Sequence, residues 1–217
     1  TVMVVSFVNA GLLTLTQSIG VIMGANIGTT VTAWLISALG FKVDIAAFAL
    51  PLLAFGIPLL FSGKSSRKSV GAFIFGSSFL FMGLQALKAN APDLGANPEM
   101  LAFVQNYTDM GFLSIILFLF IGAILTMIVQ ASAATMAITL IMCANGWIDY
   151  HLGVALVLGE NIGTTITANL AALTGNTQSR RAALAHLVFN IFGVMWVLVL
   201  FYPFTAAVSW FVTDVMN

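Results

Sequence analysis

The sequence predicts an all-α polytopic membrane protein, and its composition and long apolar runs are the observations that predict this class. Of its 217 residues, 60% are hydrophobic and only 6% are charged, whereas an ordinary soluble domain is about 25% charged. The apolar runs lack the alternation of a membrane barrel, so helices are expected to satisfy the backbone in lipid. Seven basic residues balance seven acidic ones, which excludes a nucleic-acid partner bound through its phosphates.

The apolar runs define the expected membrane spans, because a spanning helix requires about 20 mainly apolar residues. Such runs lie at 12–39, 45–61, 70–88, 112–129, 131–147, 152–173 and 183–201, with a shorter one at 1–10. A short polar tip separates 112–129 from 131–147, and we expect these two runs to form a re-entrant hairpin over 112–147. Two full spans are the alternative.

Charged residues in the loops orient these spans, since an excess of lysine and arginine marks cytoplasmic loops. Two loops carry the basic residues Lys64, Arg67, Lys68, Arg180 and Arg181, and a third stretch carries the acidic residues Asp93, Glu99 and Asp109. We therefore expect 62–69 and 174–182 to be cytoplasmic and 89–110 to lie outside.

One sequence motif occurs twice. Residues 24–35 read GANIGTTVTAWL and residues 159–170 read GENIGTTITANL, so nine of the twelve positions are identical at an offset of 159 − 24 = 135. The expected topology runs the first copy from inside to outside and the second from outside to inside. The chain is therefore predicted to contain inverted-topology repeats, an architecture typical of secondary transporters.

Each copy of the motif is expected to break its helix, because glycine, asparagine and paired threonines are poor material for a helix interior. The broken helices would be 12–39 and 152–173. Unwound carbonyls and asparagine side chains suit sodium, which indicates Gly24, Asn26, Gly159 and Asn161. A half-helix capped by threonine would face an anion, which indicates Thr29, Thr30, Thr164 and Thr165. Close helix packing through Gly-x-x-x-Gly is the alternative.

Two further features carry polar groups into the expected membrane region. Glu160 is the one acidic or basic residue inside an expected span, and such a residue costs about 2.5–3.5 kcal/mol on insertion scales. We expect Glu160 to hold sodium or to titrate, and a neutral structural role is the alternative. At the hairpin tip, Gln130 and Ser132 supply neutral donors and acceptors for an oxyanion.

The Gln130-Ala131-Ser132 tip, followed by the second copy of a duplicated Asn-Ile-Gly-Thr-Thr motif, resembles the sodium/phosphate cotransporter family in its bacterial branch. The resemblance implies a plasma-membrane transporter that couples inward sodium flow to phosphate uptake by alternating access. It places Gln130, Ser132 and Thr135, with the asparagines and threonines of both motifs, around phosphate and sodium. The family signature is Gln-Ser-Ser-Ser, from which Ala131 and Ala133 depart. Sodium would be a co-substrate, with no other cofactor and no transition metal.

The repeats divide the chain into 1–61, a connecting part 62–111 containing helix 70–88, and 112–217, which closes with helix 183–201 and a tail. The offset of 135 pairs Met136 with Thr1. The first-copy equivalents of Gln130 to Thr135 are therefore expected upstream of Thr1, so that the chain is a fragment without the first hairpin tip. The resemblance also implies a cytoplasmic PhoU-like domain in some full-length relatives. A homo-oligomer is left open.

Other classes of function are less well supported by the residues. A passive anion channel or a structural membrane subunit is one alternative. Rings of charged residues would indicate a channel, none is visible in the sequence, and inverted broken helices indicate alternating access instead. An intramembrane serine protease would use Ser77 or Ser78 with a base such as His186, and a serine nucleophile needs that base within hydrogen-bond reach. We expect no enzyme.

Overall fold

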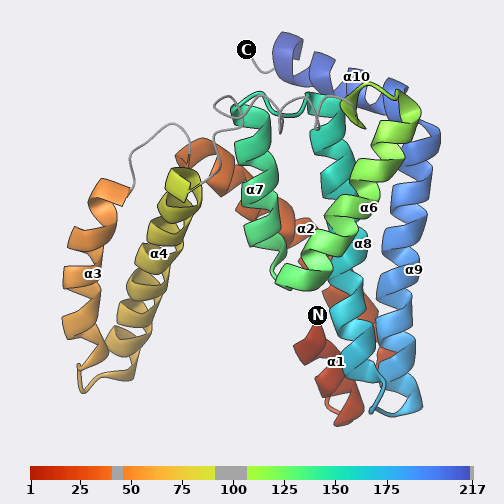
Figure 1. Ribbon diagram of the computed structural model, residues 1–217. Helices are drawn as coiled ribbons and strands as arrows, with labels where there is room; N and C mark the ends of the chain where they lie inside the picture. Colours follow the sequence, from red (N-terminus) through yellow and green to blue (C-terminus); the bar gives the residue numbers. More distant parts are fainter. Residues whose placement is uncertain (41–45, 91–106, 216–217) are drawn as a thin grey trace. The chain divides into compact units, whose positions relative to one another are not determined.

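The computed structural model describes residues 1–40, 46–90 and 107–215. Most of the expected outside loop 89–110 falls outside the described residues. The described part is helical (Figure 1), which confirms the all-α class. The chain divides into two units, Thr1–Thr29 with Pro98–Asn217 and Thr30–Asn97, and each is a body of its own.

The helices follow the expected apolar runs, with α2 crossing the boundary between the two units. Their bounds are α1 Val2–Asn9, α2 Leu15–Gly40, α3 Ala46–Leu60, α4 Ser65–Asn90, α6 Phe112–Val129, α7 Ser132–Ala144, α8 Tyr150–Ala172, α9 Thr177–Val199 and α10 Phe201–Trp210, followed by a π-helical turn Phe211–Val215. Side-chain caps stand at the start of α2, α8 and α9. At α2 the backbone N–H of Gln17 donates to Thr14 Oγ1 at 3.3 Å. The carboxylate of Asp149 accepts the backbone N–H of Leu152 at the start of α8, and Asn176 accepts that of Ser179 at the start of α9.

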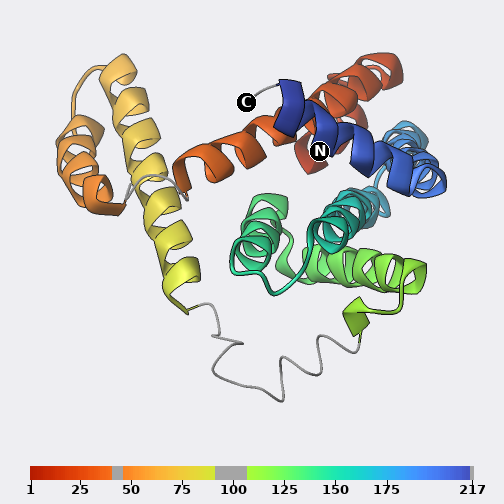
Figure 2. The same cartoon turned by 90° about the horizontal axis from the view of Figure 1, so that it is seen from above.

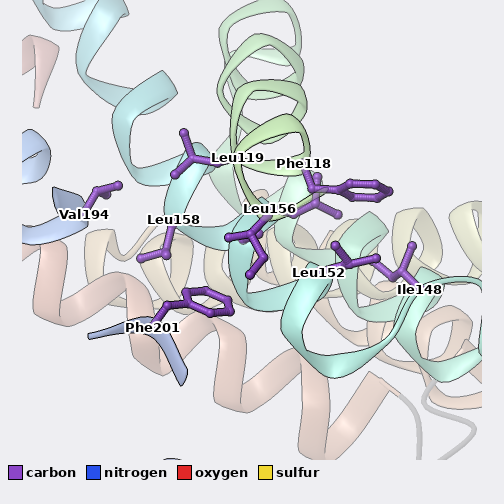
Figure 3. Packing of buried hydrophobic residues seen from close by; sticks show 10 residues of the cluster. Phe118, Leu119, Ile148, Leu152, Leu156, Leu158, Val194 and Phe201 are labelled. Atoms are coloured by element: carbon purple, nitrogen blue, oxygen red, sulfur yellow. The ribbon is translucent and has the colours of Figure 1, made fainter. Parts of the chain in front are cut away.

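The first unit is built around the contact of α6 with α8, beside which α7 packs (Figure 1, Figure 2). Glycines on both helices make this contact close. A Cβ added at Gly122 would overlap the carbonyl of Leu156, and one added at Gly159 would overlap the carbonyl of Leu119. Larger side chains from these helices and from α9 and α10 form a hydrophobic core around this contact, among them Phe118, Leu152, Val194 and Phe201 (Figure 3). The core of this unit thus depends on backbone-to-backbone proximity.

Helix α1 is attached to the end of the first unit at which α8 meets α9. The backbone N–H of Asn176 donates to Asn9 Oδ1 at 2.7 Å, and Asn176 Nδ2 donates to the Asn9 carbonyl at 3.1 Å. Val5 of α1 also packs with Ala168, Ala172 and Ala183. The C-terminal end of α1 therefore lies beside the α8–α9 turn (Figure 1).

The second unit is a helical hairpin of α3 and α4. Glycine again permits the close approach, since a Cβ at Gly71 would lie 2.8 Å from Leu59 Cβ and from the backbone nitrogen of Leu60. The basic residues Lys64, Arg67 and Lys68 lie exposed in the turn and at the start of α4.

The prediction that the motif helices are broken is wrong for this structure, because α2 and α8 run through both motifs without interruption. Threonine hydroxyls donate to carbonyls of the preceding turn, as from Thr29 to Ala25 at 3.0 Å and from Thr164 to Glu160 at 2.8 Å. These bonds keep the polar side chains satisfied inside a helix. In α8 the glycines serve helix packing instead of unwinding.

Two helices of the described part are long and apolar enough to cross a membrane. They are α6 and α9, whose 18-residue apolar windows have mean hydropathies of 2.9 and 2.1. On α9 a row of large apolar side chains is exposed, including Val188, Phe192 and Val199, as is typical of a face in contact with lipid. Helix α8 is of similar length, but Glu160 and the motif threonines make its centre more polar. Shorter apolar helices lie at Ala49–Leu60 and Ser132–Ala144.

The two copies of the motif provide a matched test of glycine packing. Gly159→Ala forces a methyl group onto the Leu119 carbonyl, whereas nothing described lies within 4 Å of a Cβ at Gly24. Overpacking costs typically about 1–3 kcal/mol, so we expect Gly159→Ala to lower the unfolding midpoint in detergent and Gly24→Ala to preserve it. Equal midpoints for the two variants would contradict this account of the α6–α8 contact.

Candidate functional site

A polar pocket lies at the tip of the α6–α7 hairpin and against α8. Its volume is about 260 Å³, and it is lined by Thr126, Gln130, Ala131, Ser132, Ala133, Thr164 and Thr167. Three residues predicted to bind the anion, Gln130, Ser132 and Thr164, thus line one cavity although they come from different elements. The second copy of the duplicated motif and the hairpin tip meet here.

The hairpin tip owes its shape to the backbone conformations of two successive residues. Gln130 has φ 55° and ψ 24°, the left-handed region, and Ala131 is extended at φ −142°. The chain then enters α7 at Ser132, so that the first turn of α7 borders the pocket. Unpaired N–H groups and the positive end of the helix dipole favour an anion at such a position.

The pocket wall carries neutral polar groups. The hydroxyl of Ser132 and the amide of Gln130 offer donors and acceptors. The hydroxyls of Thr126, Thr164 and Thr167 donate within the protein and so present acceptor lone pairs. No charged residue lines the cavity in the described part of the chain. The arrangement can hold a small polar solute by hydrogen bonds. An anion bound there would need a positive charge from elsewhere, such as a co-bound cation.

Two other predicted anion ligands lie within the helix packing beside the pocket. Thr135 is buried, accepts a hydrogen bond from Thr126 Oγ1 at 3.2 Å and donates to the Ser132 carbonyl at 3.0 Å. Thr165 is also buried and donates to the Ile162 carbonyl at 2.7 Å. In this structure both hydroxyls support the frame of the site and do not line the cavity.

Sequence reasoning did not identify Thr126 and Thr167 as site residues. Thr167 belongs to the duplicated motif, and its identity with Thr32 in the first copy is a signal by which it could have been predicted as a site residue. Thr126 lies one helical turn before Gln130, so the helical period places both on one face. Its role becomes apparent once the hairpin is seen to fold onto α8.

Glu160 is a deeply buried acidic residue near this pocket, with 2% of its surface exposed. Thr139 Oγ1, from α7, donates to Glu160 Oε1 at 2.7 Å, while Oε2 has no hydrogen-bond partner among the described residues. The residues on either side of Glu160 lie in other surroundings, since Gly159 packs on α6 and Asn161 is exposed. Of these three predicted sodium ligands, Glu160 alone combines burial with an unpaired oxygen.

The first-copy residues lie on α2, and none of them lines the pocket in the described structure. Gly24 is exposed, Thr29 bonds to its own helix, and Asn26 Nδ2 is buried with no described hydrogen-bond partner. Thr30 belongs to the second unit. The predicted roles of these residues in binding therefore stay predictions.

The described geometry gives no support to a serine nucleophile. Ser78 donates to the Ile74 carbonyl at 2.8 Å within its own helix. His186 is buried in the first unit, and its two ring nitrogens have no hydrogen-bond partner in the described residues. Ser78 lies in the second unit.

A helical protein with two helices apolar enough to cross a membrane, and with a pocket of neutral polar groups between a hairpin tip and a third long helix, has the features of a solute transport protein. The chain belongs to the Na+/Pi-cotransporter family, whose model matches residues 1–89 and 95–211. This confirms the resemblance drawn from the hairpin tip and the duplicated motif.

Curated relatives of the chain carry names of different precision. A Bacillus subtilis (strain 168) protein, "Uncharacterized protein YqeW", is 31% identical over 97% of this chain and 64% of its own length. "Putative inorganic phosphate export protein YjbB" of Salmonella typhimurium is 28% identical over 94% of this chain and 36% of its own length. "Sodium-dependent phosphate transport protein 2B" of Rattus norvegicus is 41% identical over 43% of this chain and 13% of its own length.

The chain thus spans less than two thirds of the length of these relatives. No solved structure matches it significantly. The names of the family and of its relatives indicate a transporter and not an enzyme.

The left-handed conformation of Gln130 can be separated from its side-chain chemistry by substitution. Left-handed backbone costs roughly 1–2 kcal/mol for a residue with a Cβ, and more for a β-branched one. We expect Gln130→Gly to keep or raise the unfolding midpoint of the protein in detergent, and Gln130→Val to lower it. A lower midpoint for glycine than for valine would show that the tip does not adopt this conformation.

Proposed function

We propose that the full-length parent protein transports inorganic phosphate across the plasma membrane together with sodium. The observation that carries the proposal is the pocket in which Gln130, Ser132 and Thr164 meet the start of α7. Neutral donors around a helix N-terminus favour an oxyanion. The family and the names of its relatives support phosphate as that oxyanion.

Sodium is the proposed source of the positive charge that the pocket lacks. Glu160 supports this role, because its Oε2 is buried without a described partner, and an unpaired buried carboxylate is costly. Asn26, Asn161, Gly24 and Gly159 remain proposed contributors from the two motifs. A cation that binds only alongside the anion raises the affinity of each for the other, and this is the free energy of coupling.

Inverted repeats are proposed as the architecture of the transporter. At the offset of 135, the end of α1 at Asn9 corresponds to the end of α7 at Ala144, and the start of α2 at Leu15 to the start of α8 at Tyr150. The joints also share a left-handed glycine, with φ 75° at Gly11 and 70° at Gly146. The first joint lies beside the end of α8, and the second precedes its start, which supports opposite orientations.

Alternating access between these repeats is the proposed means of transport, with the hairpin 112–147 re-entering from outside. The loops 62–69 and 174–182 are proposed to be cytoplasmic. The position of α1 supports this assignment in part, since its joint to α2 lies beside 174–182. For the full-length protein we also propose assembly with further copies of itself and a PhoU-like cytoplasmic domain. Phosphate export is a second candidate direction of transport, and the name of the relative YjbB supports it.

Transport by the full-length protein in proteoliposomes tests this proposal. We expect uptake of labelled phosphate driven by an inward sodium gradient, and none when potassium replaces sodium. Imposing the gradient in the opposite direction distinguishes uptake from export. Equal fluxes in sodium and potassium would contradict sodium coupling, and the absence of any phosphate flux would contradict the substrate.

Two substitutions test the pocket itself. Ser132→Ala and Thr164→Val each remove a hydroxyl from its wall, and a hydrogen bond to a charged group contributes about 1.5–3 kcal/mol. We expect each variant to weaken the apparent affinity for phosphate about tenfold or more. Thr213→Val is the matched control, because Thr213 donates to the carbonyl four residues earlier, as Thr164 does, but far from the pocket along the chain. Unchanged affinity in both pocket variants would assign the cavity to packing.

A further inference from the structure

The interface of α7 with α8 contains a line of polar residues that leads from Glu160 to the pocket. On α8, Glu160, Thr164 and Thr167 are spaced by four and three residues, and on α7, Ser132, Thr135 and Thr139 are spaced by three and four. These spacings place each set on one helical face. The contact of Thr139 with Glu160 forms one end of the line, and the pocket lined by Ser132, Thr164 and Thr167 forms the other.

The Thr139–Glu160 contact determines which carboxylate oxygen is left for a ligand. Both residues are 2% exposed, and the hydroxyl of Thr139 donates to Oε1 at 2.7 Å. The side chain is thereby held in one orientation, with Oε2 buried and unpaired among the described residues. Burial of an unpaired polar atom costs free energy, which a cation at this oxygen would offset.

This pair is a feature of the second copy alone. At the offset of 135, Glu160 corresponds to Ala25 and Thr139 corresponds to Val4. The carboxylate and the hydroxyl that holds it are therefore both absent from the first copy, although nine of the twelve motif positions are identical. The contact between the two side chains can therefore form in the second copy alone.

Two connections link this unit to the pocket. Helix α7 carries both Thr139 and Ser132, seven residues or about 10 Å apart along the axis. On α8 the hydroxyl of Thr164, which lines the pocket, donates to the carbonyl of Glu160 at 2.8 Å. A change in how α7 and α8 meet at Glu160 therefore changes the separation of Ser132 from Thr164 across the pocket.

We propose that Thr139 is a positioning residue which orients Glu160 toward the cation, and that α7 transmits cation occupancy to the anion pocket. The proposal rests on the proposed function, since it assigns the coupling of sodium to phosphate within that site. The hydroxyl of Thr139 contacts neither solute. It acts by fixing the carboxylate and by joining it to the helix whose first turn borders the anion.

Equilibrium binding to the purified full-length protein tests the proposal without transport. Phosphate affinity is measured in sodium chloride and in choline chloride, and sodium affinity is measured directly with labelled sodium. In the wild type we expect sodium to tighten phosphate binding about tenfold, within the usual range of coupling between sites. In Thr139→Val we expect this enhancement to fall below about twofold and sodium binding to weaken, while phosphate affinity in choline stays near that of the wild type.

Three further variants separate positioning from a general loss of structure. Thr139→Ser keeps the hydroxyl and is expected to restore the enhancement. Thr205→Val removes a buried hydroxyl that bonds within α10, and it is expected to keep the full enhancement. In the Glu160→Gln background, which carries no buried charge, Thr139→Val is expected to have no additional effect on sodium affinity. This double variant keeps the test open if Thr139→Val alone does not fold.

The outcomes distinguish this inference from the proposed function. Full sodium enhancement in Thr139→Val, or an equal additional loss in the Glu160→Gln background, would overturn the role of Thr139 and leave the transporter proposal standing. Absence of phosphate binding, or of any sodium enhancement, in the wild type would overturn both.

Discussion

The close approach of α6 to α8 is the constraint on which the rest of the first unit depends. Gly122 and Gly159 allow the two backbones to meet where a Cβ would overlap a carbonyl. In a membrane, where burial in lipid does not itself drive helices together, such small-residue contacts are a main source of association. This contact holds the hairpin tip against α8, and the pocket is formed where the tip ends.

The two copies of one motif meet different surroundings. In α8, Gly159 and Gly163 pack against α6 and Thr164 borders the pocket, whereas in α2 the described surroundings of Gly24 and Gly28 are open. Duplication supplied the same residues twice, and tertiary contacts gave one set a packing role. The pair of Glu160 with Thr139 then adds a buried carboxylate to the second copy alone. The site described here is therefore asymmetric despite its repeated sequence.

The helices and part of the pocket could be predicted from sequence, because both follow from local signals. Apolar runs locate the helices, and a polar tip between two runs locates Gln130 and Ser132. Continuity of α8 could not be predicted, because it depends on the close packing of α6 against Gly159, which local propensity does not include, and the hydroxyl of Thr164 finds its partner within the helix. Thr126 and Thr139 were missed for a related reason. Each acquires its role only from the helix that it faces.

The two hydrogen bonds that Asn176 donates to Asn9 change which helices belong together mechanically. Chain order assigns α1 to the first repeat, yet its C-terminal end is bonded to the turn that joins the last two long helices of the second. In the alternating access proposed above, a rearrangement that separates the two proposed repeats must either break these hydrogen bonds or carry α1 along with α8 and α9. If α1 moves with α8 and α9, the boundary between the two rigid bodies falls after Asn9, within the first repeat instead of between the repeats.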